Sequence, residues 1–494
     1  MITRILKSIK LNSINNISKA SRLSYSSLTY DPRSTIFAVA SGKGKCGVSV
    51  IRVSGPKAFD CISSLTQKPI TKFPANKLTY SPIYDPSTNS LIDRGMLVKF
   101  QEPNSFTGEN VVEFHVHGSV AIVKKLLEVL NGFEFFRSAE SGEFTKRSFF
   151  NGKLDLTQVE GLADLLEAET EVQRKLALKQ SEGELGQLYQ RWRYGIIDIL
   201  SQLEAWIDFS EDEELDPILL KTCHNLANEL ILDLKSHLED GRKGEILREG
   251  IKLAILGPPN AGKSSLLNWL VKREAAIVSP IAGTTRDLVE VRVEIGGFPV
   301  IIVDTAGLRD SEDIIEVEGM KRALKQAKEA DFNLLVLDGT KLNSADKEEY
   351  IRSLYSKFSL NEYKKNTIIL YNKSDLYEGA NLVESELEKI PNFKVSCETH
   401  EGLNEVLGHL KKKFDIEYDN VLGSDSLVIT QTRHKLLINR AVEKLEHFIE
   451  LLPVDPVLSV EDLRGATMEI GKLTGEITLD HILDQLFKSF CIGK

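Results

Sequence analysis

The sequence predicts a multidomain protein of mixed α/β and all-α class, in which a second α/β module is inserted into a long helical segment. Three observations lead to this prediction. Short apolar β-type runs alternate with turns between residues 31 and 152. Leucines with helical spacing dominate residues 153–248 and again 417–494. The intervening residues 249–416 carry apolar runs that each end in a glycine-rich or polar turn, which is typical of a parallel sheet.

The first 30 residues differ in composition from the rest of the chain. They are rich in serine and asparagine and contain no acidic residue. Isoleucines and leucines near helical spacing alternate with five basic residues: Arg4, Lys7, Lys10, Lys19 and Arg22. This pattern is typical of an amphipathic transit peptide and lacks the unbroken apolar core of a secretory signal. We therefore expect residues 1–30 to direct the chain to the mitochondrial matrix; a disordered basic tail is the alternative.

The remaining composition is that of an ordinary globular protein. Of the 494 residues, 42% are hydrophobic, and no apolar run is long enough to span a bilayer. Without the five leader cations the formal net charge of −10 becomes −15, which argues against non-specific nucleic-acid binding by the whole body. Any RNA contact is expected to use a local patch or a partner's surface. The scattered cysteines show neither zinc spacing nor a disulfide framework and fit a reducing compartment: Cys46, Cys61, Cys223, Cys397 and Cys491.

The expected elements follow the same order along the chain. In residues 31–152, β-type runs lie at 35–41, 47–53 and 111–116, with a helix at 121–130. From Leu154 onward the apolar residues recur at helical offsets. The acidic run 208–216, closed by Pro217, is expected to be an interhelical loop. Helical spacing returns at 218–247 and again from 427 to the end.

The most informative motif lies at the start of the inserted module. The apolar run Ile251–Leu256 is followed by Gly257, four residues, and then Gly262, Lys263 and Ser264. The glycines allow the backbone to wrap a polyphosphate with its amide groups, the lysine reaches the outer phosphates, and the serine hydroxyl ligates magnesium. The sequence therefore predicts a phosphate-binding loop (P-loop) between a strand and a helix.

A second apolar run, Val300–Val303, ends in Asp304, Thr305, Ala306 and Gly307. A carboxylate at the tip of this strand can hold magnesium through water, and Gly307 leaves room for its amide to meet the γ-phosphate. Upstream, the polar break 283–287 places Thr285 where it can complete the magnesium shell while the γ-phosphate is present. The residues from Val289 to Val303 then predict a hairpin around two glycines.

A third run, Thr367–Tyr371, leads into Asn372, Lys373, Ser374 and Asp375. In this pattern the Asp375 carboxylate accepts hydrogen bonds from N1 and N2 of guanine, a donor pair that adenine lacks. The last strand and the loop that caps guanine are expected at 393–398, where Cys397 stands in place of the usual alanine. The predicted GTP site contains the following residues: Asn260, Ala261, Gly262, Lys263, Ser264, Ser265, Ser279, Thr284, Thr285, Asp304, Thr305, Ala306, Gly307, Asn372, Lys373, Asp375, Ser396 and Cys397.

The residue that positions the attacking water cannot be the usual one. Ras-like proteins carry a glutamine directly after the Asp-x-x-Gly turn, whereas this chain has Leu308. From the residues alone, a monovalent cation, a partner or a nearby charged side chain is expected to position the water and stabilise the charge. The charged candidates are Arg309, Asp310, Glu312, Asp313, Glu316 and Glu318.

Beyond the GTP motifs, the chain resembles the MnmE (TrmE) family of tRNA-modifying GTPases in a mitochondrial form. The specific motifs lie outside the GTPase module: residues 47–55 (GVSVIRVSG), 104–109 (NSFTGE), 142–147 (GEFTKR), 151–156 (NGKLDL) and 490–494 (FCIGK). The resemblance covers essentially everything after residue 30. It implies an N-terminal tetrahydrofolate-binding and dimerisation domain at 31–152, a helical domain in two parts at 153–248 and 417–494, and a Ras-like GTPase domain at 249–416.

The resemblance also assigns a folate site, with 5,10-methylene- or 5-formyl-tetrahydrofolate as ligand. The residues that match the family's positions are Arg52, Glu113, Lys153 and Lys494. This set suits the ligand because a carboxylate can bind the amide and amino edge of a pterin, while cations suit its glutamate tail.

Potassium is likewise implied by the resemblance and not by the residue types themselves. In the family the cation takes the place of an arginine finger where two GTPase modules meet, and the matching ligand positions are Asn260, Ser279, Ile281 and Thr284. Glu316 matches the acid that positions water through a second water, and with Lys263 it forms the expected catalytic pair. The magnesium ligands are expected to be Ser264, Thr285 and, through water, Asp304.

The implied function is a potassium-stimulated GTPase that works as a homodimer with a FAD-containing partner of MnmG (GidA) type. Together they modify carbon 5 of the wobble uridine in mitochondrial tRNAs, with a carboxymethylaminomethyl or taurinomethyl type of group and a one-carbon unit from the folate. Cys491 is a candidate nucleophile because a thiolate can add to uridine; a small residue that anchors the tail is the rival interpretation. Two other functions stay open: a ribosome-assembly GTPase of the Era type, and a dimeric scaffold that only regulates a partner.

Overall fold

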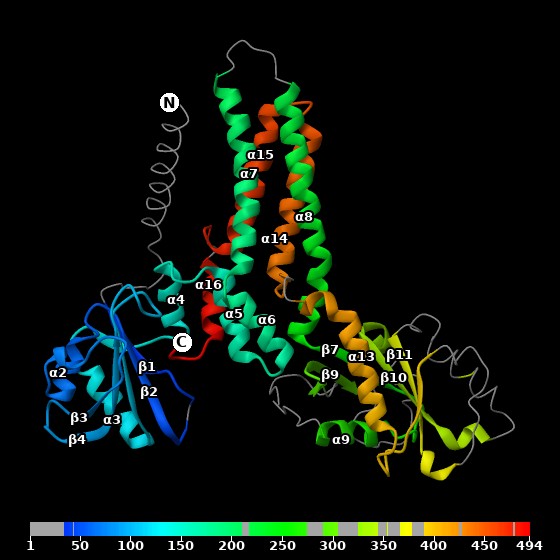
Figure 1. Cartoon of the computed structure of the whole chain (residues 1–494), viewed down its shortest axis with the longest axis horizontal. Helices are drawn as coiled ribbons and strands as arrows, with labels where there is room; N and C mark the ends of the chain where they lie inside the picture. The colour runs from blue at the N-terminus through cyan, green and yellow to red at the C-terminus, as the bar shows by residue number, and fades with distance from the viewer. Residues whose placement is uncertain are drawn as a thin grey trace. The chain divides into compact units, whose positions relative to one another are not determined.

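The computed structural model describes residues 34–42, 44–209, 217–273, 290–304, 325–343, 353, 366–377, 390–423, 427–477 and 480–494 (Figure 1). The chain divides into two compact units. Unit 1 combines residues 1–159 with 477–494, and unit 2 is formed by residues 160–476. None of the described helices is both long enough and apolar enough to cross a membrane.

Unit 1 is built on a six-stranded sheet with the strand order β3-β4-β5-β2-β1-β6. Neighbouring strands are antiparallel, except that β1 and β6 run parallel. The three β-type runs and the helix expected from the sequence are all present within a few residues. The strands are β1 (Thr35–Val39), β2 (Cys46–Ser54), β3 (Thr79–Tyr84), β4 (Leu91–Phe100), β5 (Val111–Gly118) and β6 (Phe136–Ser138).

One face of this sheet is apolar and packs against α2 (Asp60–Thr66) and α3 (Val120–Asn131). Successive side chains of a strand point to opposite faces, so on β5 the residues Val112, Phe114 and Val116 enter this core. The alternate residues, Glu113 among them, lie on the opposite face. That second face carries the polar residues considered below.

The C-terminal tail belongs to unit 1. Helix α16 (Asp480–Ser489) packs against α4 (Glu143–Phe150), with the ring centroids of Phe149 and Phe487 6.4 Å apart. Ile492 forms a β-bridge with Ser141, and Gly493, at φ +109°, lies against the Val39 carbonyl. We predicted residues 417–494 as the second part of the helical domain. In the structure, residues 477–494 are grouped with unit 1, and Leu483 and Phe487 of α16 are buried there.

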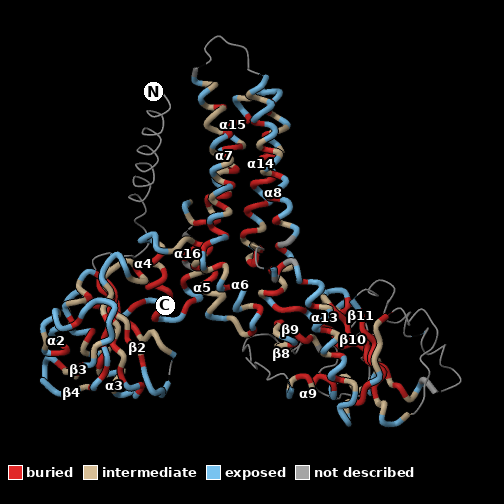
Figure 2. The backbone as a smooth tube through the Cα atoms, in the orientation of Figure 1, coloured by how far each residue is buried: buried red, intermediate tan, exposed pale blue. Residues whose placement is uncertain are grey.

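Unit 2 contains a bundle of long helices joined to an α/β module. Within the bundle, the facing sides of the four longest helices are buried along their length (Figure 2). Their packing explains why the apolar residues of this region recur at helical spacing. The bundle helices are α5 (Leu156–Glu167), which begins in unit 1, α6 (Glu171–Ser181), α7 (Glu184–Phe209), α8 (Pro217–Glu249), α14 (Thr432–Leu451) and α15 (Pro456–Thr474).

The α/β module has a six-stranded sheet with the order β12-β11-β10-β7-β9-β8. All pairs are parallel except β8 with β9, which form the hairpin expected around Gly296 and Gly297. The strands are β7 (Ile251–Leu256), β8 (Glu290–Ile295), β9 (Phe298–Asp304), β10 (Phe332–Asp338), β11 (Thr367–Asn372) and β12 (Asn392–Lys394), and the described helices that flank them are α9 (Lys263–Arg273) and α13 (Leu403–Leu422).

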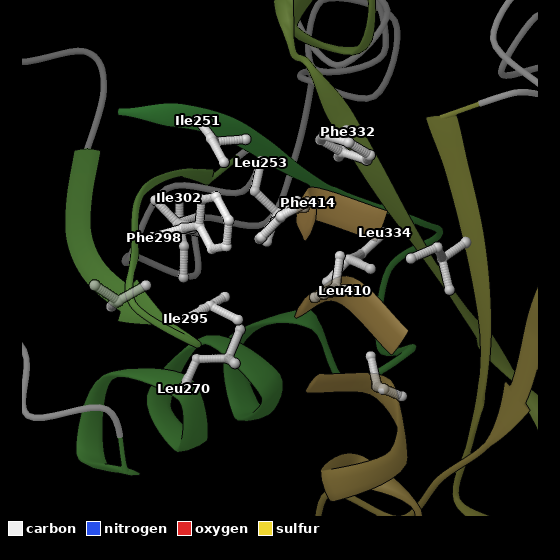
Figure 3. Close-up of a cluster of buried hydrophobic side chains, with 14 of the residues drawn as sticks. Ile251, Leu253, Leu270, Ile295, Phe298, Ile302, Phe332, Leu334, Leu410 and Phe414 are labelled. Carbon is white, nitrogen blue, oxygen red and sulfur yellow. The ribbon is translucent and has the colours of Figure 1, made fainter. Parts of the chain in front are cut away.

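The helices and the sheet of unit 2 share one core. Phe414 of α13 stacks edge-on against Phe298 and Phe332, at centroid distances of 5.5 and 5.0 Å (Figure 3). The same cluster includes Leu247 near the end of α8, one turn before the strand that carries the P-loop. Gly250 adopts φ +121° between α8 and β7, a conformation that favours glycine. The predicted fold class, with a P-loop α/β module inserted into a helical domain, is confirmed.

Replacing Phe414 with alanine tests this shared core. The ring is fully buried between two strands and a helix, so Phe414→Ala should lower the stability of unit 2 by about 3–5 kcal/mol, since it removes apolar area and leaves a cavity. Calorimetric melting of the full chain measures the loss. The control is Ile416→Ala, two residues away on the same helix but 78% exposed, which should change stability by less than about 0.5 kcal/mol. Equal effects of the two substitutions would contradict the shared core.

Candidate functional site

The predicted nucleotide residues of unit 2 lie at one edge of its sheet. The P-loop follows β7, Asp304 ends β9, Asn372 ends β11, and Ser396 follows β12. Because these strands are parallel, their carboxyl ends meet at the same edge, which is where ligands bind in open α/β sheets. The structure therefore brings together loops that are more than a hundred residues apart in sequence.

The P-loop backbone takes the form its glycines allow. Gly257, Asn260 and Gly262 adopt φ values of +145°, +61° and +102°. A Cβ atom on Gly257 would collide with the Val336 carbonyl, so no larger residue fits there. Lys263 opens helix α9, and its Nζ donates hydrogen bonds to the carbonyls of Gly257 and Pro258, at 3.0 and 2.9 Å. The Lys263 ammonium is therefore hydrogen-bonded to the first two residues of the P-loop.

Asn372 ties the P-loop to the base-reading loops. Its side chain is buried, and its Nδ2 donates to the carbonyl of Ala261 at 2.8 Å. Its Oδ1 accepts from the amide of Cys397 at 3.0 Å. A Cβ on Gly262 would occupy the place of the Asn372 carboxamide, so the glycine and the asparagine require each other. One carboxamide therefore sets the distance between the phosphate end and the base end of the site.

Asp375, in the short 3₁₀ helix η4 (Ser374–Leu376), is oriented by Ser396. The Ser396 hydroxyl donates to Asp375 Oδ1 at 2.6 Å, and it accepts from the amides of Glu398 and Thr399 at 3.2 and 3.1 Å. Asp375 itself is exposed. An oriented and accessible carboxylate is what a purine with an amino and an N–H donor requires.

Lys373 has an ion-pair partner that was not predicted from the sequence. Its Nζ contacts Asp338 Oδ2 at 2.7 Å, and Asp338 also accepts from the amide and hydroxyl of Thr340 at 3.1 and 2.7 Å. Although burial opposes it, these hydrogen bonds lower the pKa of Asp338 below its ordinary value. The available signal was positional: Asp338 ends the buried strand β10, as Asp304 ends β9.

Cys397, noted above as a departure from alanine, keeps the geometry of its loop. Its function in the contact with Asn372 depends on the backbone amide, which any residue supplies. The side chain is partly buried, 4.0 Å from the Gly262 carbonyl, and burial raises the pKa of its thiol to about 11. The thiol is therefore neutral at physiological pH and acts as a small packing group.

Several predicted residues lie outside the described part of the chain. Ser264 and Ser265 are described and exposed at the start of α9, whereas for Asp304 only the backbone is described. The remaining predicted residues lie outside the described part of the chain, and their predicted roles stay untested: Ser279, Ile281, Thr284, Thr285, Thr305, Ala306, Gly307 and Glu316.

A second candidate site lies on the polar face of the unit 1 sheet. Arg52 on β2 and Glu113 on β5 are cross-strand partners, and Arg52 Nε donates to Glu113 Oε1 at 2.8 Å. The guanidinium lies over the rings of Phe106 and Phe144, 5.4 and 5.7 Å from their centroids. Two of the residues that resemblance assigned to a ligand are thus in direct contact, 15% and 16% exposed.

The last residue of the chain reaches the same place. Burial and the neighbouring Arg52 lower the pKa of the Lys494 amine, while Glu113 partly offsets them. Lys494 therefore adds a second cation beside the carboxylate. Lys153 lies next to this group rather than in it: its Nζ donates to the Pro103 carbonyl at 3.0 Å, in the loop that also carries Phe106.

A buried arginine that sequence reasoning did not single out holds that loop in place. Arg147 of α4 is fully buried, and its Nη1 donates to the Ser34 carbonyl at 2.9 Å and to Glu109 at 3.0 Å. Its Nη2 pairs with Glu143 at 3.0 Å. Burial alone would raise the pKa of Glu143, but Arg137 and Arg147 hold it below its ordinary value. The only sequence signal was that Arg147 and Glu109 end two of the motifs that carry the family resemblance.

Cys491 is exposed and carries a free thiol. It stands between the buried Phe490 and the bridged Ile492, and its carbonyl accepts from the Lys494 amide at 3.2 Å. The tail is therefore anchored by its neighbours and not by the cysteine side chain. Its predicted nucleophilic role stays untested.

Comparisons with known proteins cover both units. The family model described as the MnmE helical domain matches residues 156–491, and the one described as the GTP-binding protein TrmE N-terminus matches residues 35–153. A Danio rerio protein named 5-taurinomethyluridine-[tRNA] synthase subunit GTPB3, mitochondrial, is 42% identical over 471 residues, which are 93% of each chain. The tRNA modification GTPase MnmE of Rickettsia rickettsii (strain Sheila Smith) is 45% identical over 462 residues, 93% of this chain and 100% of the relative.

A third relative, the tRNA modification GTPase gtpbp3, mitochondrial, of Dictyostelium discoideum, is 42% identical over 525 aligned positions that cover 100% of both chains. These matches extend well beyond the GTP motifs, so the similarity is not that of P-loop proteins in general. With the P-loop, the guanine-reading loops and the Arg52–Glu113 face all in one chain, they lead to a single assignment: the chain belongs to the MnmE (TrmE) family of tRNA-modification GTPases.

Proposed function

We propose that this chain is a potassium-stimulated GTP hydrolase that modifies carbon 5 of the wobble uridine of mitochondrial tRNAs. It does so with a FAD-dependent partner of MnmG (GidA) type and a one-carbon unit from tetrahydrofolate, and it attaches a group of the carboxymethylaminomethyl or taurinomethyl type. The observation that carries the proposal is the presence in one chain of an assembled guanine-nucleotide site and of the Arg52–Glu113–Lys494 group.

The nucleotide site fits GTP with magnesium. The positive φ values of Gly257, Asn260 and Gly262 suit a loop whose backbone amides bind a phosphate. Ser264, exposed at the start of α9, and Asp304, at the tip of β9, are the groups that would hold the ion. When bound, magnesium neutralises charge on the phosphates. Lys263 stabilises the developing negative charge, and Asp375 selects the base.

The Arg52–Glu113 face fits a reduced folate. Glu113 lies beside Arg52 and offers two carboxylate oxygens, which match the amino and N–H edge of a pterin. Lys494 and Lys153 supply cations that suit the glutamate tail of the ligand. The fit rests on the types of group present: the Glu113 carboxylate is paired with Arg52, and two lysines lie nearby.

The same face supports a homodimer. Tyr80 on β3 and Met96 on β4 are cross-strand partners, 59% and 48% exposed, and His115 on β5 is the next residue in the row. Adjacent exposed apolar side chains on a sheet mark interaction surfaces in soluble proteins. A second copy of the chain is the partner we assign to them.

The mitochondrial setting rests on residues 1–30 and on the relatives. Those residues combine five cations with no acid, and two of the relatives carry mitochondrial names. Because the chain carries a net negative charge, we expect the FAD-dependent partner to supply most of the surface that binds tRNA. Cys491, exposed at the end of the chain, remains the candidate nucleophile toward uridine.

Loss of the gene should remove the wobble-uridine modification from mitochondrial tRNA. Mass spectrometry of nucleosides from organellar tRNA of cells with and without the gene measures this directly. Reintroducing the intact chain should restore the modified nucleoside, whereas Lys263→Ala should not, because it removes the cation of the P-loop. Unchanged nucleosides in the deleted cells would exclude the proposed modification.

Potassium should accelerate GTP turnover by about tenfold or more over sodium at equal ionic strength, because a fixed cation stabilises transition-state charge. Asn260, exposed in the P-loop at φ +61°, is a proposed ligand, so Asn260→Ala should abolish the difference between the ions. Asn268→Ala, an exposed asparagine of helix α9, is the control and should keep it. Equal rates in the two salts for the unmodified chain would refute the role of potassium.

Reduced-folate binding should depend on Glu113. Glu113→Gln removes a charged acceptor and should weaken 5-formyl-tetrahydrofolate binding by about 10- to 100-fold, since a hydrogen bond to a charged group contributes about 1.5–3 kcal/mol. Titration calorimetry measures the change, and GTP turnover should stay the same. The matched control is Glu128→Gln, an exposed glutamate of α3, which should bind like the unmodified chain. Undiminished binding by Glu113→Gln would exclude this folate site.

A further inference from the structure

His115 lies beside the Arg52–Glu113 pair with one ring nitrogen unused. It follows Glu113 by two residues on β5, so both side chains lie on the same face of the sheet, and its cross-strand partners are Val50 and Met96. Its Nε2 is 3.6 Å from Glu113 Oε2. This nitrogen is buried and has no hydrogen-bond partner among the described residues. A buried polar atom without a partner is costly, which points to a group that ligand binding would satisfy.

The contacts of Glu113 place its two oxygens in a definite order. Oε1 accepts from Arg52 Nε at 2.8 Å, so Oε2 is the oxygen on the His115 side. A lone pair on Nε2 would face this oxygen, so the proton of the imidazole is favoured on Nε2. From Arg52 outward, the face therefore presents acceptor, acceptor and donor: Oε1, Oε2 and the Nε2–H of His115.

The edge of a 4-oxo pterin carries the complementary order. Its 2-amino group and N3–H are donors, and its 4-oxo oxygen is an acceptor. Resting on the proposed function, in which Glu113 binds the first two groups, we propose that His115 is a specificity-determining residue that donates from Nε2 to the 4-oxo oxygen. The site then distinguishes 4-oxo pterins from 4-amino pterins, because a 4-amino group would present a second donor to the Nε2–H.

Arg52 is the competing donor for the 4-oxo group. Its Nε is already bound to Oε1, and its guanidinium is packed over Phe106 and Phe144. His115, in contrast, has a nitrogen with no partner in the described structure. The unpaired nitrogen of His115 is therefore the group assigned to the oxygen. The Nη groups of Arg52 are the alternative donors, and if they bind the oxygen, His115→Leu will leave the preference unchanged.

The experiment compares tetrahydrofolate with its 4-amino analogue, tetrahydroaminopterin, in which an amino group replaces the 4-oxo group and N3 carries no hydrogen. Because the change at N3 also affects the contact with Glu113, the test of His115 is how His115→Leu alters the preference between the two ligands. Affinities are measured anaerobically with the full-length chain. The unmodified chain should prefer the 4-oxo ligand. His115→Leu should weaken tetrahydrofolate binding by about three- to tenfold, the effect of one lost neutral hydrogen bond, and should change binding of the 4-amino ligand much less. His115→Gln, which keeps a donor, should restore part of the preference.

His117→Leu is the matched control. His117 lies on the same strand and face, two residues further on, but its Nδ1 pairs with Asp93 at 2.9 Å, and its side chain is 69% exposed. This variant should retain the preference for the 4-oxo ligand. Circular dichroism and light scattering show whether each variant keeps its fold and oligomeric state, and the glutamine variant serves if the leucine variant does not fold.

Two outcomes overturn the inference, and they are distinguishable. If the unmodified chain binds both ligands and His115→Leu weakens them equally or not at all, His115 does not read carbon 4, and the folate site itself stands. If the unmodified chain binds neither ligand, the proposed folate site fails, and the function of His115 fails with it.

Discussion

The nucleotide site depends on one buried carboxamide. Asn372 donates to the P-loop carbonyl of Ala261 and accepts from the amide of Cys397, so it fixes the separation of the phosphate and base ends. The Asn372 side chain is buried, so a lost hydrogen bond leaves a polar group unsatisfied and costs about 1–3 kcal/mol. The close approach of Asn372 also explains why position 262 must be glycine. The P-loop and the loops predicted to bind guanine are therefore joined in a single packing arrangement.

The Arg52–Glu113 face is held in place by buried ion pairs, whereas the nucleotide site is held by the hydrogen bonds of an amide side chain. Arg147 is fully buried and bridges Glu109, Glu143 and the Ser34 carbonyl, which joins helix α4 to the loop that carries Phe106. Removing one partner of such a buried ion pair typically costs about 3–5 kcal/mol, because the remaining charge stays buried. Phe106 in turn packs over Arg52, and the C-terminal tail brings Lys494 to the same carboxylate. Ser34, the first described residue, and Lys494 thus both contribute to the polar side of unit 1.

In unit 2, the helical bundle holds the nucleotide module through contacts close to the P-loop strand. Arg248, at the end of α8, pairs with Asp164 of α5 at 2.8 Å, and its carbonyl accepts from Gln173 of α6 at 2.9 Å. One turn earlier on α5, the buried Glu160 binds Arg433 and His434 of α14. Burial opposes ionisation of Glu160, yet its contacts with His434 and Arg433 lower its pKa below the ordinary value. Charged contacts as well as apolar packing therefore join α8, which leads into β7, to α5 and α14.

The sequence by itself determined the fold class and the nucleotide. Gly257, Lys263, Asn372 and Asp375 stand at spacings that only a P-loop strand and a guanine-reading strand require, and the structure brings Asn372 and the P-loop into contact. Such motifs are local, so they can be recognised in one stretch of chain. Only the tertiary structure decided that residues 477–494 pack in unit 1, that Arg147 anchors the Phe106 loop, that Asp338 holds Lys373, and that His115 Nε2 faces Glu113. Each of these is a contact between distant residues whose types are common on protein surfaces, and their burial and distances exist only once the strands and helices have packed together.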